Sequence, residues 1–268
     1  MRRRDLVVGV LAAVAAVVAL AFLVLPVAAI FLRVPPGQLV HQLSSGVVTD
    51  ALIVTAKTSL IAQALVLLFG TPLAYLLASR RFRGRALAIT LVELPLVLPP
   101  AVAGLGLLAA FGRVGLLSTS IAFTQTAVVL AVAFVSSPLY ILPAMVAFEA
   151  VDPDVVAASR TLGAGPAKTF FRVVLPLARD GLAGGEALAF ARGLGEFGAT
   201  IMFAGSLQGV TQTLSLAIYE EFSVDFDTAL AMGALLVVVS VVLLVFLKLV
   251  LSWQFSRRTS GSLFARSS

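Results

Sequence analysis

The fold is decided around residues 149–176, where the sequence reads EAVDPDVVAASRTLGAGPAKTFFRVVLP. This stretch carries charges of both signs and is interrupted by glycine and proline. The rest of the chain is strongly apolar. Hydrophobic residues make up 60% of the 268 residues, charged residues 12%, and the mean hydropathy is +1.08, whereas soluble domains are about half apolar and a quarter charged. A folded, charged segment in such a chain predicts a site outside a membrane at which a partner binds.

Six apolar runs flank this stretch, and each has about the 20 residues with which a helix crosses a bilayer. The first run follows three arginines, as in a signal peptide, but it is longer than the roughly 7–15 apolar residues of a signal, so we interpret it as an uncleaved span. The pattern predicts an all-α integral membrane protein with six transmembrane helices. The runs cover approximately residues 6–32, 52–78, 86–111, 121–148, 182–204 and 228–251.

The distribution of lysine and arginine orients these spans, because cytoplasmic loops carry more of both. Basic residues gather at the N-terminus, in the connection 80–85, in 149–176 and in the C-terminal tail, whereas the connection between the fifth and sixth runs has none. We therefore expect both termini and 149–176 to face the cytoplasm. The basic residues are separated by apolar runs instead of forming one basic face, so no nucleic-acid binding is expected.

Three parts follow from this organisation. Residues 1–49 hold the N-terminal tail, the first transmembrane helix and an outer loop, residues 50–253 form the transmembrane domain, and residues 254–268 form a basic cytoplasmic tail. The chain has no cysteine and one histidine, His41, which we interpret as a loop residue. No metal or other cofactor is expected, because a metal site needs several such ligands.

Residues 149–176 have the local signals of two short helices. Asp152 is placed to cap a helix that begins at Pro153, and Gly163 is placed to end it. A second helix would begin at Gly165-Pro166, before Leu175-Pro176 turns the chain back to the membrane. The alternative is a loop whose helices lie on the lipid headgroups. The apolar residues expected to fill a partner's groove are Val155, Val156, Leu162, Phe170 and Phe171.

The run GAGPAKT, residues 163–169, superficially looks like a phosphate-binding P-loop. That motif needs a glycine directly before the lysine and another five residues earlier. Ala167 and Leu162 stand at these positions. We therefore do not expect this chain to bind ATP.

Residues 151–176 resemble the "EAA" loop of permease subunits of binding-protein-dependent ABC importers, whose short coupling helix docks into a groove on the ATPase subunit. The matching residues are Asp152-Pro153, Ala158, Leu162-Gly163-Ala164, Phe170 and Leu175-Pro176. The resemblance implies an ATPase-coupling loop that includes Asp152, Pro153, Leu162, Gly163, Ala164, Lys168, Phe170 and Pro176. The sequence departs from the motif where its leading glutamate is replaced by Ala157 and its third residue is Ser159, so any contact of that glutamate is absent or replaced here.

Two further segments are similar to those of molybdate importer permeases. They are ELPLVLPPAVAG, residues 93–104, and ARGLGEFGATIMFAG, residues 191–205. The resemblance covers about residues 50–253. It implies a multi-pass, non-catalytic subunit of a prokaryotic cytoplasmic membrane. This subunit would form a homodimer with two copies of an ATP-binding ABC subunit and receive molybdate from an extracytoplasmic binding protein. Sulfate/thiosulfate or tungstate permeases, an ion-gradient-driven secondary transporter and a membrane scaffold are the alternatives.

The same two segments hold the candidates for the pathway or gate. Pro99, Pro100 and Gly104 make a regular third span unlikely, and broken helices at membrane depth line cavities or are buried in protein. In the fifth run, Arg192 and Glu196 are four residues apart and can pair on one helix face; Thr200 follows one turn later. Simple packing or a self-neutralising pair is the alternative interpretation of both segments.

Overall fold

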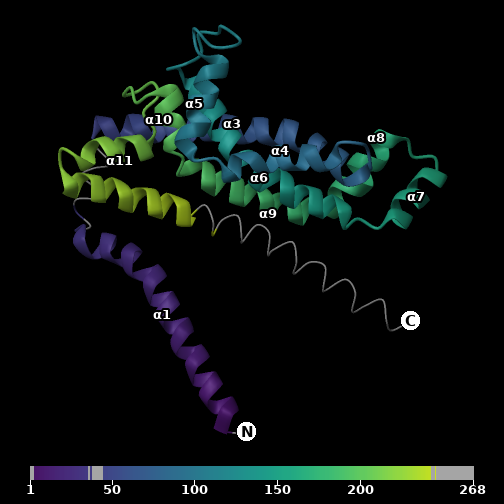
Figure 1. The fold of residues 1–268 in the computed structure, drawn as a ribbon, viewed down its shortest axis with the longest axis horizontal. Helices are drawn as coiled ribbons and strands as arrows, with labels where there is room; N and C mark the ends of the chain where they lie inside the picture. Colours follow the sequence, from purple (N-terminus) through teal and green to yellow (C-terminus); the bar gives the residue numbers. More distant parts are fainter. Residues whose placement is uncertain (1–2, 36, 38–44, 243–244, 246–268) are drawn as a thin grey trace.

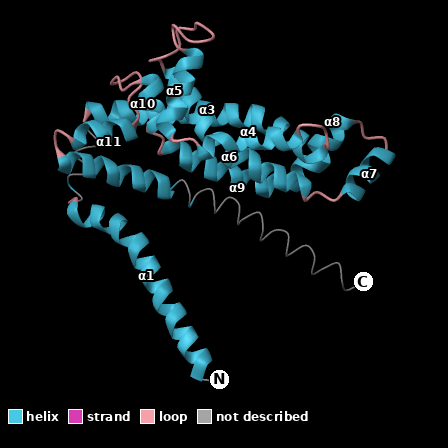
Figure 2. Ribbon diagram, in the orientation of Figure 1, coloured by secondary structure: helices cyan, strands magenta, loops and turns pink. Residues whose placement is uncertain are grey.

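The computed structural model describes residues 3–35, 37, 45–242 and 245. His41 and the predicted tail 254–268 lie outside them. Every regular element in the described part is a helix (Figure 2), which confirms the all-α class. The helices are α1 (Arg3–Arg33), α3 (Gly46–Ser79), α4 (Arg85–Val97), α5 (Pro100–Phe111), α6 (Gln125–Glu149), α7 (Pro153–Thr161), α8 (Pro166–Thr169), the π-helical turn η1 (Phe170–Val174), α9 (Leu175–Leu194), α10 (Gly198–Ala204) and α11 (Leu214–Phe222). A further apolar helix spans Phe226–Val242.

The body of the molecule is a bundle in which α6 packs against α3 and α9 (Figure 1). Small residues let these helices approach closely. At Gly181 of α9, a Cβ atom would lie 2.4 Å from the Cβ of Ala147 in α6. At Gly185, one turn further along α9, a Cβ would lie 3.2 Å from the carbonyl oxygen of Tyr140. The glycine pair of α9 therefore serves the packing of this bundle.

Helix α1 projects away from the bundle, and the apolar side chains along it are exposed (Figure 1). Such an apolar helix belongs in lipid or against another chain, because exposing so large an apolar surface to water is unfavourable.

Three described helices are long and apolar enough to cross a membrane: α1, α3 and α6. A fourth span is obtained if α4 and α5, which meet at a bend of 115°, count as one broken span. The fifth predicted run is not one helix, because it is divided into α9 and α10. The sixth begins as the shorter helix Phe226–Val242, and most of its remainder lies outside the described residues. A membrane-spanning helical architecture is thus confirmed, while six spans remain a prediction.

Candidate functional site

The segment from α7 to η1, residues 153–174, forms a knob at one end of the bundle (Figure 1). Asp152 caps α7, since its Oδ1 accepts a 2.8 Å hydrogen bond from the backbone N–H of Asp154. Pro153 stands at the first helical position, where its missing N–H costs nothing. The predicted start of this helix is confirmed.

The end of α7 is a Schellman motif built around Gly163. The N–H of Gly163 donates to the carbonyl of Arg160, and the N–H of Ala164 donates to the carbonyl of Ser159, at 3.0 and 3.1 Å. Gly163 has φ +82°, a left-handed conformation that strains any residue with a Cβ. The predicted glycine turn is therefore confirmed, and it turns the chain sharply between α7 and α8.

The knob is anchored to the bundle by Phe170, which is half-buried instead of fully exposed. Its ring lies 4.8 Å from that of Tyr75 in α3 and 6.1 Å from that of Phe148 in α6, centroid to centroid. Val156 packs against the same cluster. The side chains of Ser159 and Thr169, 2.9 Å apart, connect α7 to α8. The knob is consequently packed firmly against α3 and α6, and its two short helices are hydrogen-bonded to each other.

The second predicted short helix does not end before Pro176, so that prediction is wrong. α8 continues through η1 into α9, and the N–H of Leu175 donates to the carbonyl of Phe170, five residues earlier. Pro176 has no N–H to donate, and a widened turn of this kind accommodates such a gap in the ladder without ending the helix. The knob therefore joins the membrane helix α9 directly.

Leu162 and Val155 are exposed on α7 and the turn that follows it, and we call this surface the outer face of the knob; Phe171 instead lines a pocket with Leu67 and Leu68 of α3. Leu162 is 87% exposed, Phe171 65% and Val155 44%. Large apolar side chains this exposed mark a surface that a partner covers. Lys168 and Pro176 are exposed too, and Ala164 is half-buried.

The second candidate region is the crossing of the two broken spans. Between α4 and α5, Pro99 caps α5 and Pro100 is its first residue, so the chain leaves one helix and starts another at 115°. Gly104 lies where α5 crosses α10. A Cβ there would be 2.5 Å from the carbonyl oxygen of Ala199 and 2.8 Å from the Cβ of Met202. Gly104 is thus required by close backbone approach.

The break between α9 and α10 is stabilised by the carboxylate of Glu196, which is buried. Its Oε1 accepts a 2.7 Å hydrogen bond from the N–H of Ala199, in the first turn of α10. Its Oε2 lies 2.7 Å from Nη1 of Arg192, although the angle is poor for a hydrogen bond, so the contact is mainly an ion pair. The predicted pair is present, but α9 ends at Leu194, so the two residues bridge a helix end and do not share one helix face.

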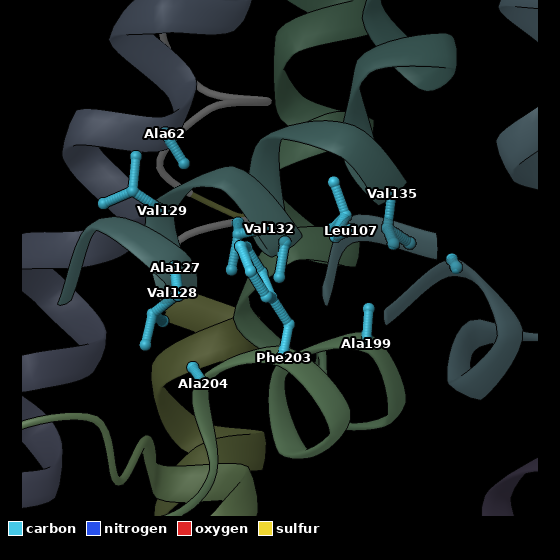
Figure 3. Packing of buried hydrophobic residues seen from close by; sticks show 12 residues of the cluster. Ala62, Leu107, Ala127, Val128, Val129, Val132, Val135, Ala199, Phe203 and Ala204 are labelled. Carbon is cyan, nitrogen blue, oxygen red and sulfur yellow. The ribbon is translucent and has the colours of Figure 1, made fainter. Parts of the chain in front are cut away.

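Buried side chains close the crossing of α5, α6 and α10 (Figure 3). Phe203 of α10 packs among Leu107 of α5 and Val132 of α6. Thr200 is fully buried in α10, and its hydroxyl has no hydrogen-bond partner among the described residues. The six predicted gate residues therefore come together in one region made by the two breaks.

Sequence reasoning missed a buried polar group in the bundle. Gln63 of α3 donates from Nε2 to the Ser136 hydroxyl of α6 and to the carbonyl of Ala189 in α9, at 3.2 and 3.4 Å. It ties three helices together in an apolar interior, where such bonds matter because water is absent. A lone glutamine inside the second apolar run was the signal that could have found it.

Comparison with known proteins decides the family. Residues 70–258 match the binding-protein-dependent transport system inner membrane component family. The chain belongs to this family. Relatives of this inner membrane component include the molybdenum transport system permease protein ModB of Mycobacterium tuberculosis, 43% identical over 84% of this chain and 88% of the relative. ModB of Escherichia coli is 38% identical over 79% of this chain and 96% of the relative.

Solved structures of transporters share the fold of this inner membrane component. A bacterial ABC transporter that imports the acidic polysaccharide alginate has a chain with a TM-score of 0.70 at 18% identity, covering 93% of this chain and 96% of that one. A chain of the MetNI methionine ABC transporter, in an inward-facing conformation, has a TM-score of 0.63 at 17% identity, covering 77% of this chain and 95% of the other. The chain is a translocation component, not a catalyst.

Proposed function

We propose that this chain is the permease subunit of an ATP-driven molybdate importer. The observation that carries the proposal is the anchored knob, whose apolar outer face is exposed, in a chain 43% identical to a molybdenum permease. The knob offers an ATPase subunit a rigid surface to bind. Because its last turn continues into α9, displacement of the knob is transmitted along a membrane helix.

The assembly we propose has two copies of this chain, two ATPase subunits below the knobs and an extracytoplasmic binding protein at the opposite face. Each copy crosses the membrane six times with both termini in the cytoplasm, as the loop charges indicate. The family description names a transport system that depends on a binding protein. The exposed apolar surface of α1 supports packing against lipid and a second copy.

The pathway in this proposal runs past the crossing of the broken spans, where Pro99, Pro100, Gly104, Arg192, Glu196 and Thr200 lie. Arg192 is the cation nearest to a passing dianion, with its side chain 35% exposed, and Glu196 neutralises it. An arginine whose charge is partly neutralised by a neighbouring carboxylate attracts an oxyanion without holding it tightly, which suits transport more than storage. Accordingly, Arg192→Ala lowers uptake at equal membrane abundance, and wild-type uptake in that variant would contradict this role.

The decisive experiment measures radioactive molybdate uptake in cells that carry or lack this chain. Uptake is expected to need the chain, to stop when its ATPase partner is deleted, and to resist excess sulfate. Uptake that survives loss of the ATPase would support an ion-gradient-driven transporter instead. Competition by sulfate or tungstate at equal concentration would reassign the substrate within the tetrahedral oxyanions, although the relatives named for molybdenum favour molybdate.

A further inference from the structure

A cleft of about 580 Å³ lies between the knob and the bundle, and neither Leu162 nor Val155 of the outer face lines it. One wall is α7, which contributes Ala157 and Arg160, and the other comes from the ends of α3 and α6 together with Arg81, which follows α3. Tyr75 and Phe148 belong to the apolar part of the lining. The lining therefore combines two arginines with two aromatic rings, which makes the cleft amphipathic.

The cleft has two positive charges that nothing in the described part of the chain neutralises. Glu149 also lines it, but Arg85 occupies that carboxylate through a 2.5 Å ion pair and donates from Nε to the carbonyl of Leu77 at 2.7 Å. The guanidinium groups of Arg81 and Arg160 form no ion pair or hydrogen bond with any described residue. Two arginines at one cleft suit a phosphate group, whose oxygens accept several hydrogen bonds from guanidinium.

The level of the cleft along the bundle indicates where such a phosphate comes from. The apolar run of α3 ends at Ala78, which lines the cleft, and Arg81 follows three residues later. A spanning helix changes from apolar to basic at the headgroups of the bilayer. Basic pockets at that level on membrane proteins bind anionic headgroups.

We propose that this cleft binds one anionic phospholipid, with Arg81 and Arg160 holding the phosphate and the aromatic rings lying against the glycerol and acyl carbons. The apolar half of the lining favours a lipid over free phosphate, which has no carbon to bury. A lipid held there contacts α7 from the membrane side while the outer face of the knob stays open. The knob would then be positioned by the bilayer as well as by the bundle.

The test titrates the purified full-length chain in detergent with phosphatidylglycerol, and counts bound lipid by native mass spectrometry. Arg81→Gln and Arg160→Gln are each expected to weaken binding about fivefold, and the double variant about 30-fold, since each basic residue near a charged headgroup contributes a similar factor. Arg83→Gln, which removes the same charge from the same loop outside the cleft lining, is the matched control and should bind as the wild type does. Phosphatidylcholine should bind equally weakly to the wild type and all four variants.

A second pair of variants adds charge instead of removing it. In Ala157→Glu the new carboxylate lies in the cleft, three residues before Arg160 on α7, where it can pair with that arginine. The Ala157→Glu variant should weaken phosphatidylglycerol binding about as much as the removal of one arginine does. Ala158→Glu changes the net charge equally, but Ala158 does not line the cleft, so lipid binding should persist.

Three results would overturn the proposal. The first is phosphatidylglycerol binding that is unchanged in the double arginine variant. The second is full displacement of the lipid by millimolar inorganic phosphate, which would make this a site for a free anion. The third is a loss of ATPase co-purification in the arginine variants with lipid binding intact, which would assign the cleft to an acidic segment of that partner.

Discussion

The knob and the crossing of the broken spans both interrupt helices, yet they satisfy the freed backbone groups by opposite means. In the knob, α7 is closed by local caps, Asp152 at one end and Gly163 at the other, in contact with water. At the crossing, the first turn of α10 is capped by Glu196, a carboxylate that is 2% exposed. The difference shows that a helix end in water is capped by neighbours in sequence that water can replace, whereas the buried end at the crossing depends on a carboxylate that carries its own counter-ion.

The largest expected effect comes from Glu196→Ala. It removes the acceptor for the N–H of Ala199 and leaves Arg192 without a counter-charge, so we expect a loss of about 3–5 kcal/mol, the cost of breaking a buried pair. Glu196→Gln keeps a side-chain acceptor and nearly the same volume, so it should lower the free energy of unfolding clearly less than Glu196→Ala does. Thermal unfolding in detergent measures both. Equal losses would show that the cap contributes little, and the contrast with the knob would fail.

The next effect concerns Gly104, where α5 and α10 approach each other closely. Gly104→Val forces a side chain onto the backbone of Ala199 and should cost roughly 1–3 kcal/mol, as overpacking does. Gly106→Val, two residues along the same helix, meets nothing within 4 Å and is the control. The two variants are compared by unfolding temperature and molybdate uptake. If Gly106→Val destabilises as much as Gly104→Val, the close approach of α5 and α10 is not what requires glycine.

A smaller and local effect is expected at Gly163, where only the backbone conformation requires glycine. Gly163→Val places a branched residue at φ +82° and should cost about 1–2 kcal/mol within the knob. A Cβ at Gly163 would meet no atom within 4 Å, and the same is true at Gly165, which has no positive φ. Gly165→Val is therefore a matched control. We expect Gly163→Val to reduce co-purification with the ATPase while the unfolding temperature of the bundle hardly changes. Normal co-purification and transport would refute the docking role of the knob.

The smallest effect is expected for the cap of α7. Asp152→Ala removes the bond to the N–H of Asp154 and should cost about 1 kcal/mol, because the exposed N–H can bond to water instead. Hydrogen exchange of the α7 amides should quicken about fivefold, whereas Asp152→Asn, which keeps an acceptor, should stay near the wild type. If Asp152→Ala lowered the stability as much as Glu196→Ala does, the proposed difference between the two kinds of cap would be wrong.

Local signals predicted the knob well and the crossing only in part. The caps of α7 and the break at Pro99 and Pro100 were readable because each depends on residues adjacent in sequence. The break between α9 and α10 contains no proline, so the sequence predicts one continuous helix over residues 182–204. The sequence does not show on which side of a short helix the bundle lies, so it could not separate Phe170, which packs on Tyr75 and Phe148, from the exposed Leu162.

The sequence by itself determined that this chain is helical, belongs in a membrane and carries a capped, charged segment, because hydropathy and caps act over a few neighbouring residues. Only the tertiary structure decided which glycines must stay small, that Phe170 anchors the knob, and that Glu196 caps a second helix beside Gly104. Those features depend on backbones that approach from distant parts of the chain. At such contacts the available space, more than the residue's own propensity, sets the free energy.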